Sequence, residues 1–232
     1  MGDGLDPERE AAAAAAVERI EPGMTIGLGS GRAVWRVIDL LASRSGDRPL
    51  PRAAFASDRT AELGRNAGIE AVELDGETRL DLAIDGADEV GPELALIKGG
   101  GAALLREKLV VCAADRFVVV AEKRKRVDRL ATGFKVPVEV VRFAWRDTRR
   151  RLLDLLPTAE LRTDDDGSPV LTDEGHHLLD CGLPEDADPA ALGAAIKASV
   201  GVVEHGLFIG LADEVLLGRE DGGVDVLRRG QG

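Results

Sequence analysis

The chain has 232 residues, of which 44% are hydrophobic, enough for the core of one large domain or two smaller ones. Its 42 acidic and 30 basic residues give a formal charge of −12, which argues against nucleic acid or an anionic membrane as a partner. No apolar run reaches the roughly 18 residues of a membrane span, and no signal peptide is evident. Two distant cysteines, Cys112 and Cys181, fit a reducing compartment, so we expect a cytoplasmic protein.

Strand and helix patterns alternate over the first 130 residues. Helices are expected over residues 8–20, 34–42 and 59–67, and strands over 24–28, 53–57, 69–74, 80–84, 94–97 and 117–121. The last of these strands is almost continuously apolar, as is typical of a parallel sheet covered on both faces. The alternation predicts a doubly wound α/β sheet.

A glycine-rich loop follows the first strand, with the sequence Gly27-Leu28-Gly29-Ser30-Gly31. Strand, glycine loop and helix in this order form a phosphate cradle, because free N–H groups at a helix start favour an anion. Many such turns are glycine-rich for packing alone. The loop also lacks the third glycine of the dinucleotide fingerprint.

The pattern changes near residue 133. Strands are expected over 136–141, 159–163, 169–172 and 177–180, with helices over 145–156 and 188–199. Pro137 suits an edge strand, because proline cannot donate to a neighbour. Residues 202–217 and 224–227 are strand-like and are expected to return to the first sheet. We therefore divide the chain into a catalytic domain, residues 1–130 and 205–232, and a small α+β domain, residues 131–204.

The strongest candidate for a functional site is the stretch from Asp85 to Lys108. An apolar strand ends at Asp85, and Asp88 and Glu89 follow closely. A second apolar run then leads to Lys98, three glycines and a helix that carries Glu107. Ligands of open α/β sheets bind outside the carboxyl ends of the strands, so carboxylates, a lysine and an anion-binding loop are expected to share one pocket.

Each of these signals also has a structural explanation when it is taken alone. Asp-Gly is a common turn pair, and a glutamate between arginine and lysine usually lies on a solvated helix face. The three histidines, His176, His177 and His205, form no metal-binding pattern, so neither a metal nor another cofactor is expected.

Four segments resemble ribose-5-phosphate isomerase, type A, and the resemblance extends over nearly the whole chain. They are AIDGADEV (83–90), IKGGGAALLREK (97–108), PVEVV (137–141) and GVVEHGLF (201–208). The resemblance implies a Rossmann-like open parallel sheet domain with a smaller ferredoxin-like domain. It also implies interconversion of D-ribose 5-phosphate and D-ribulose 5-phosphate in the pentose phosphate pathway, without a cofactor, by a homodimer or homotetramer.

The same resemblance implies roles for individual residues. Glu107 takes the place of the general base, and Asp85, Asp88 and Lys98 stand where the family keeps its other catalytic groups. The implied substrate-binding residues are Ser30, Gly31, Arg32, Ala33, Gly86, Ala87, Gly99, Gly100, Gly101 and Lys125.

These groups suit the chemistry of an aldose–ketose isomerase. Glu107 could carry a proton between adjacent carbons, and Lys98 could stabilise the negative oxygen of the enediol intermediate. Asp85, helped by Asp88, is our candidate for opening the sugar ring. Two like charges this close would raise the pKa of one of the carboxyl groups, so that it could act as a proton donor.

The chain departs from the family in three places. Its first loop has Gly-Arg-Ala at 31–33 where the family has two hydroxyl residues, and Arg124 replaces a serine before Lys125. In the small domain, the segment at 172–176 contains Glu174 and His176 in place of asparagines. We expect that Arg32 compensates for the lost hydroxyls, with Lys125 on the other side of the phosphate; alternatively, Arg32 points to solvent.

Two other functions remain as alternatives. An aminosugar-phosphate deaminase or a lactonase would share the sheet and the phosphate loop, but would be expected to place a histidine near its acids. A non-catalytic sugar-phosphate-binding protein would have little reason to retain Asp85, Asp88, Lys98 and Glu107 together.

Overall fold

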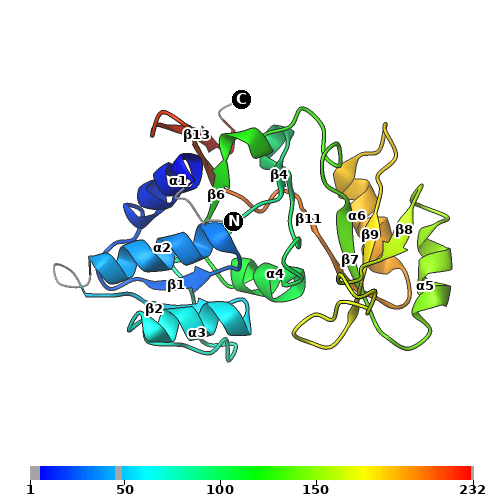
Figure 1. Ribbon diagram of the computed structural model, residues 1–232, viewed down its shortest axis with the longest axis horizontal. Helices are drawn as coiled ribbons and strands as arrows, with labels where there is room; N and C mark the ends of the chain where they lie inside the picture. The colour runs from blue at the N-terminus through cyan, green and yellow to red at the C-terminus, as the bar shows by residue number, and fades with distance from the viewer. Residues whose placement is uncertain (1–5, 45–48, 231–232) are drawn as a thin grey trace.

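The computed structural model describes residues 6–44 and 49–230, and within them six strands form the large sheet (Figure 1). Its order is β13-β12-β6-β3-β1-β2, parallel except for β13. The strands are β1 (Thr25–Leu28), β2 (Arg52–Phe55), β3 (Leu82–Gly86), β6 (Phe117–Glu122), β12 (Glu214–Gly218) and β13 (Val224–Arg228). The predicted doubly wound sheet is confirmed.

Helices cover both faces of the large sheet. On one face lie α1 (Pro7–Val17) and α2 (Arg32–Ser43), which share an apolar core with Val118 and Val120 of β6. The opposite face carries α4 (Leu104–Cys112), whose Val110 and Val111 share a core with Val119. Successive side chains of a strand point to opposite faces, so a strand covered on both sides must be apolar throughout. This explains the continuous apolar run at β6.

The helix α3 (Asp58–Asn66) follows β2 close to the expected range of 59–67, and Ser57 is its N-cap. The Ser57 hydroxyl accepts a hydrogen bond from the Thr60 N–H at 3.1 Å. This bond satisfies one of the free N–H groups at the helix start.

A second, small sheet joins the two parts of the molecule, and the sequence did not predict it. This bridging sheet has the order β11-β5-β4 and consists of β4 (Glu89–Val90), β5 (Leu96–Ile97) and β11 (Leu207–Phe208). A short helix, η1 (Pro92–Leu94), connects β4 to β5. Because β11 lies far along the chain from β4 and β5, its pairing fixes the segment around Lys98 to the end of the chain.

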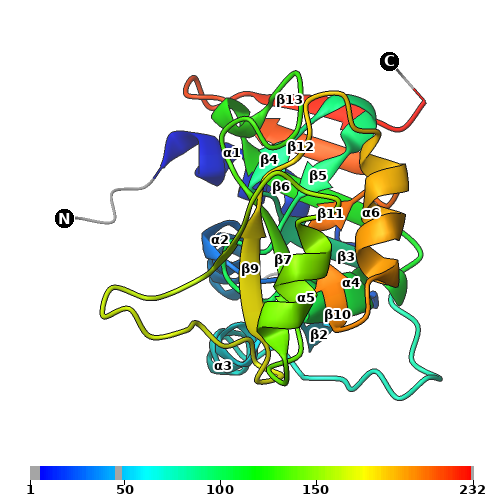
Figure 2. The same ribbon diagram turned by 90° about the vertical axis from the view of Figure 1, so that its right-hand side faces the viewer.

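The rest of the chain forms an antiparallel sheet with two helices, in the order β10-β7-β9-β8 (Figures 1 and 2). Its elements are β7 (Val136–Val140), α5 (Trp145–Leu152), β8 (Ala159–Leu161), β9 (His177–Cys181), α6 (Pro189–Ala198) and β10 (Val202–His205). Two βαβ units in this strand order form a ferredoxin-like sheet, as the resemblance implied. The division at 130/131 and 204/205 stays a prediction; residues 1–5, 45–48 and 231–232 of it lie outside the described residues.

Two predicted strands are wrong. Segment 69–74 touches the large sheet at one bridge, Ala53 with Ala71, and then turns away with exposed acidic residues. Segment 169–172 makes isolated bridges at Pro169 and Leu171. Both segments are extended, but neither has the length of paired backbone that defines a strand.

Pro137 does not lie at an edge, because β7 pairs with both β9 and β10. The carbonyl of Pro137 accepts a hydrogen bond from the Gly206 N–H at 2.7 Å, just beyond the end of β10. Proline returns no hydrogen bond, and the Gly206 carbonyl instead accepts from the Lys98 N–H at 2.9 Å. The interior proline therefore leaves the Gly206 carbonyl for the bridging sheet.

The prediction that residues 202–217 return to the large sheet is only partly right. Residues 202–217 contribute one strand to each of the three sheets, β10, β11 and β12 in turn. Only the last of these returns to the large sheet, where it pairs with β6 and β13 among the described strands. The chain after the antiparallel sheet is consequently paired first with the bridging sheet and then with the large sheet.

Candidate active site

The candidate site lies where β1 and β3 are neighbours. The chain leaves β1 toward β2 on one side and later returns as β3 on the other, so the loops after these two strands diverge. At this point Asp85 accepts hydrogen bonds on Oδ1 from the N–H groups of Ser30 at 3.2 Å and Gly86 at 2.7 Å. A Cβ on Gly29 would lie 1.8 Å from Asp85 Cγ, so this close approach requires glycine.

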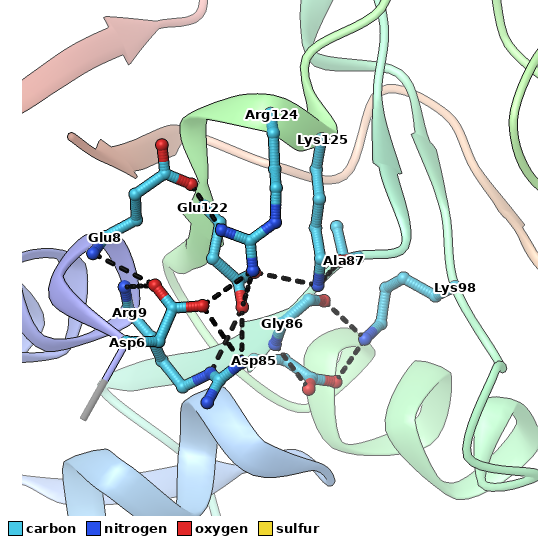
Figure 3. Close-up of polar contacts among 10 residues, drawn as sticks. All are labelled: Asp6, Glu8, Arg9, Asp85, Gly86, Ala87, Lys98, Glu122, Arg124 and Lys125. Carbon is cyan, nitrogen blue, oxygen red and sulfur yellow. Dashed lines mark hydrogen bonds and ion pairs between the residues drawn. The ribbon is translucent and has the colours of Figure 1, made fainter. Parts of the chain in front are cut away.

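Three charged side chains meet in the buried centre of the site. Lys98 Nζ lies 2.7 Å from Asp85 Oδ2 and 3.1 Å from Glu107 Oε2, and it donates to the Gly86 carbonyl at 2.7 Å. Figure 3 shows Lys98 reaching from β5 to Asp85 and Gly86. All three charged side chains are at most 4% exposed. The two carboxylates thus share one ammonium group away from water.

Burial and charge perturb all three groups. Burial raises the pKa of Glu107, and Asp85 raises it further, to about 8 despite the nearby Lys98. Burial also raises the pKa of Asp85, although Lys98 opposes this. Burial alone would lower the pKa of Lys98, but Asp85 and Glu107 together hold it above its ordinary value. Glu107 can therefore gain or lose a proton near neutral pH, while Lys98 stays charged.

Asp88 faces the glycine loop, residues 99–101. Its Oδ2 accepts a hydrogen bond from the Gly100 N–H at 2.8 Å, and a Cβ on Gly100 would lie 2.7 Å from Asp88 Oδ1. Gly99 has a φ of +101°. After Gly101 the chain enters α4, which carries Glu107 in its first turn. One loop therefore connects Lys98, Asp88 and Glu107.

Glu89, the third acid of the cluster in the sequence, has a structural role. It is buried and accepts hydrogen bonds from the N–H groups of Ala131 at 2.6 Å, Gly133 at 2.6 Å and Phe134 at 2.8 Å. These bonds hold the segment that leads into β7. Glu89 therefore points away from Asp85 and Lys98, although it follows Asp88 directly.

The loop predicted to bind phosphate, residues 29–33, leads into α2. The Ser30 hydroxyl is 3.0 Å from the Ser57 hydroxyl, and Gly31 caps the helix with a φ of +103°. Arg32 is the first residue of α2 and is exposed, and no ion pair joins it to another residue of the described chain. Ala33 is buried in the core beside β3, so it can offer the ligand backbone only.

Lys125 ends the short helix η2 (Lys123–Lys125), which follows β6. Its Nζ donates to the Ala87 carbonyl at 2.7 Å and lies 3.0 Å from Glu122 Oε2 (Figure 3). Ala87 lies between Gly86 and Asp88 in sequence, so Lys125 is brought to the same loop as the acids. Figure 3 shows this contact beside the pair of Lys98 and Asp85.

Arg124, which stands directly before Lys125, extends beside it and reaches α1 (Figure 3). Its guanidinium pairs with Asp6 at 2.6 Å and Glu8 at 2.7 Å, and Arg9 pairs with Glu122 at 2.9 Å (Figure 3). Glu122 thus forms ion pairs with Arg9 of α1 and with Lys125 of η2. Through its ion pairs with Asp6 and Glu8, Arg124 holds the start of α1 beside the site.

The small domain reaches the site through its long loop after β8. Arg106, next to Glu107, pairs with Asp173 at 3.2 Å and Glu174 at 2.6 Å of that loop, and with Asp58 at 2.8 Å. We call these four residues the clasp. Glu174, one of the departures from the family, takes part directly. His176 instead contacts the buried Glu139, with Nδ1 2.8 Å from its Oε1.

The structure places the expected site residues at the end of β3, in the loops that follow β1, β3, β5 and β6 and at the starts of α2 and α4, with Arg32 exposed. The sequence did not single out four further residues that hold them. Ser57 and Glu122 lie at or near the ends of predicted strands, so their position could have suggested a role in the site. Arg162 and Gly206 come from distant parts of the chain, where no sequence pattern indicates that they reach the site.

A buried carboxyl group with a raised pKa, a charged lysine and a glycine-lined loop define an α/β enzyme that moves a proton on an anionic substrate. Residues 53–222 match the family model described as ribose 5-phosphate isomerase A (phosphoriboisomerase A). The chain is 46% identical over 226 residues to ribose-5-phosphate isomerase A of Synechococcus sp. (strain JA-3-3Ab), covering 97% of this chain and 98% of that one. The chain belongs to the ribose 5-phosphate isomerase A family.

Solved structures agree with this assignment. Ribose 5-phosphate isomerase A from Methanocaldococcus jannaschii superimposes with a TM-score of 0.89 at 36% identity, covering 95% of this chain and 97% of that chain. A D-ribose-5-phosphate isomerase in complex with phospho-erythronic acid gives a TM-score of 0.90, with the same identity and coverage. The predicted family and fold class are therefore confirmed.

Proposed function

We propose that the chain interconverts D-ribose 5-phosphate and D-ribulose 5-phosphate through an enediol, with Glu107 as the base. The observation that carries this assignment is the buried contact of Glu107 with Lys98, 3.1 Å apart, beside Asp85. A base that takes a proton from one carbon and returns it to the next needs a pKa near neutrality. The pKa of Glu107, raised to about 8 by burial and by Asp85, meets that need.

Lys98 supports this proton transfer through its charge. When Glu107 is ionised and can act as a base, Lys98 faces two carboxylates, and when Glu107 takes the proton it faces one. At the same moment a negative charge develops on the substrate oxygen. The new oxyanion can then take the place of the Glu107 carboxylate beside Lys98, so the charge around the ammonium group stays nearly constant.

The bound acid of the related structure is consistent with this chemistry. Phospho-erythronic acid, which that isomerase binds, has a planar carboxylate next to a hydroxyl-bearing carbon. An enediolate likewise has a planar carbon with a charged oxygen. In this chain, we assign Asp85 and Asp88 to opening the sugar ring, because they lie at the end of β3 and against the glycine loop.

The phosphate is assigned to the other end of the site. Ser30, Gly31 and the N-terminus of α2 supply donors to an anion there, and Lys125 supplies a positive charge. Gly86, Ala87 and the glycine loop line the path between the phosphate and Glu107. Arg32, exposed at the same helix start, can turn toward the phosphate without breaking an ion pair to the described residues.

The direct test is conversion of ribose 5-phosphate in D₂O, followed by NMR. An enediol route forms the ketose and incorporates solvent deuterium at the carbon that receives the proton. Because Glu107 could return the same proton before it exchanges with solvent, ketose without deuterium would contradict its role only if Glu107→Gln formed this ketose at the wild-type rate. No ketose from protein that is folded would reject the isomerase proposal as a whole.

We further propose that the chain works in the cytoplasm as a homodimer or homotetramer. Cys112 and Cys181 are both unpaired in the structure, as expected in a reducing compartment. No helix in the described part of the chain could span a membrane. Phe143 and Val200, which are 88% and 75% exposed, offer an apolar surface for association, and sedimentation velocity would measure the oligomer directly.

A further inference from the structure

The glycine loop, residues 99–101, has no side chains that could fix its conformation. Glycine peptides change orientation at low cost, since they have no Cβ to restrict them. Their orientation nevertheless matters here, because N–H groups attract an anionic substrate and carbonyl oxygens repel it. Within the turn itself, the Ala102 N–H donates to the Gly99 carbonyl at 3.1 Å, so the Gly100 carbonyl is the one that needs a partner outside the loop.

Arg162, from the small domain, makes that contact. Its Nη1 donates to the Gly99 carbonyl at 2.9 Å and to the Gly100 carbonyl at 3.1 Å. Arg162 follows β8 and is far from the loop in sequence. Its side chain is 14% exposed, and the hydrogen bond to Gly99 is partly buried, whereas the bond to Gly100 lies at the exposed surface of the loop.

Arg162 is itself held by Asp180 of β9. The guanidinium Nε lies 3.0 Å from Asp180 Oδ2 and Nη2 lies 2.5 Å from Oδ1, a two-point contact that fixes the plane of the group. The backbone N–H of Arg162 also donates to the Leu178 carbonyl at 2.9 Å. Nη1 is therefore presented to the glycine loop from a rigid sheet.

The geometry of the peptide bond links this contact to the active site. In a trans peptide the carbonyl and the N–H point in opposite directions. With the Gly99 carbonyl on Arg162, the Gly100 N–H must face the other way, and it donates to Asp88 Oδ2 at 2.8 Å. By the same rule, the Gly100 carbonyl on Arg162 turns the Gly101 N–H away from Arg162 and toward the Asp88 side of the loop.

We propose that Arg162 is a positioning residue of this isomerase: it fixes the two glycine peptides so that their N–H groups face Asp88 and the substrate. Asp180 orients Arg162 for this task. The small domain thus contributes to the active site without touching substrate. The effect on turnover rests on the proposed function, whereas the effect on loop orientation stands on the contacts themselves.

The test compares Arg162→Ala with a matched control, Arg149→Ala. Arg149 also lies in the small domain and donates to a backbone carbonyl, that of Ala159 at 2.6 Å, but it has no contact with the glycine loop among the described residues. Arg162→Ala should lower kcat/KM by about 10- to 100-fold, the range for lost hydrogen bonds to a charged group. Arg149→Ala should leave kcat/KM within about 3-fold of wild type at temperatures where both variants are folded.

Chemical rescue separates positioning from general stability. Added guanidinium ion at millimolar concentration should restore part of the activity of Arg162→Ala and none in Arg149→Ala. Asp180→Asn should show a smaller loss in the same direction, and it supplies the test if Arg162→Ala does not fold. Equal losses in the two arginine variants, or no rescue of Arg162→Ala, would overturn the positioning role.

Hydrogen exchange gives a readout that does not depend on turnover. The Gly100 N–H, which donates a hydrogen bond to Asp88, should exchange faster in Arg162→Ala than in wild type. In Arg149→Ala its exchange rate should be the same as in wild type. Unchanged Gly100 exchange in Arg162→Ala would reject the inference even if the wild type isomerises ribose 5-phosphate. Faster exchange in a protein without isomerase activity would uphold the loop contact and reject the proposed function instead.

Discussion

At the scale of single residues, the chemistry of the site depends on burial. Asp85, Lys98 and Glu107 bring three ionisable groups into a space where each side chain is at most 4% exposed. Isolated charges would be strongly unfavourable there, and they are stable because the lysine pairs with both acids and with the Gly86 carbonyl. The same burial gives Glu107 its raised pKa. The sequence supplied the residue types and the spacing, but only the packing around them sets the pKa.

Replacing Glu107 with glutamine should remove the base and keep the shape. We expect turnover to fall by at least ~100-fold, the lower end for a positioned acid–base group, while sugar-phosphate binding persists. The control is Glu214→Gln, a buried glutamate on β12 that pairs with Arg19 at 2.9 Å outside the site. Near-normal turnover of Glu107→Gln would show that another group is the base.

The raised pKa of Glu107 predicts that the free energy of unfolding depends on pH, and the Glu107→Gln variant can test this. The pKa of Glu107 rises from an ordinary 4.5 to about 8 on folding, through burial and Asp85, so the folded state holds the proton more tightly. This contribution to stability is complete below pH 4.5 and is lost as the pH rises through 8. Thermal denaturation between pH 5 and 9 should therefore show Glu107→Gln gaining stability relative to wild type as the pH rises. A difference that stays constant across this range would contradict the raised pKa.

A substitution of Arg32 tests how the loop at residues 29–33 would bind the substrate phosphate. If its guanidinium grips the phosphate, Arg32→Ala should raise KM by the equivalent of about 1.5–3 kcal/mol and leave kcat largely intact. Arg59→Ala is a suitable control, because Arg59 stacks on Trp35 of the same helix at 4.8 Å without lying in the loop. An unchanged KM would leave Ser30, the loop backbone and Lys125 to hold the phosphate.

At the scale of elements, the site depends on how three sheets meet. β1 and β3 bring Ser30 and Asp85 together, β5 delivers Lys98, and α4 delivers Glu107. The bridging sheet connects these to the small domain through Gly206. The position of Lys98 is therefore set as much by the chain after residue 200 as by β5, which Lys98 follows.

Gly206 should not tolerate a side chain. A Cβ there would lie 2.2 Å from the Lys98 carbonyl oxygen and 2.8 Å from Pro137 Cδ, so the backbone would have to move. We expect Gly206→Ala to cost about 1–3 kcal/mol of stability, as overpacking does, and to lower kcat by displacing Lys98. Kinetics and denaturant unfolding measure both effects.

The comparison for this variant is Gly167→Ala. Gly167 has a φ of +84° in an exposed turn and open space around it, so alanine there would be strained but would displace nothing in the site. It should lose some stability and keep wild-type kcat. If Gly206→Ala also kept wild-type kcat, the proposed link between Gly206 and Lys98 would be wrong.

How much the sequence could predict follows from the range of each interaction. The order of most helices and strands and the segment from Asp85 to Glu107 depend on near neighbours in the sequence, so their patterns could be recognised. Pro137 was misplaced because proline usually marks an edge, whereas here the carbonyl opposite it found another donor. Arg162 was missed because an arginine among turn residues gives no sign of the loop that it will meet.

At the scale of the whole molecule, the two domains meet over the active site through charged contacts. The clasp around Arg106 joins α4, α3 and the loop after β8. Arg162 adds a second link close by. In a chain with a formal charge of −12, these arginines place positive charge between acidic surfaces that would otherwise repel one another.

Arg106→Ala should loosen the small-domain loop without unfolding the protein. Its partners are partly exposed, so we expect a loss of less than about 1 kcal/mol of stability. Hydrogen exchange over residues 173–176 should nevertheless become faster. Arg79→Ala, which breaks an exposed pair with Asp115 away from the loop, should leave exchange there unchanged. Equal exchange in wild type and Arg106→Ala would show that the clasp does not restrain the loop.

The position of the small domain, between β6 and β12, also affects how the protein is made. On the ribosome, one edge of β6 has no neighbour until the small domain has been translated and β12 has emerged. An apolar strand with an open edge can pair with other chains, so the nascent protein is exposed to aggregation throughout this interval. A chain truncated after residue 206 would keep that edge open permanently. It should accumulate as inclusion bodies or remain bound to chaperones, although it contains every residue assigned to catalysis.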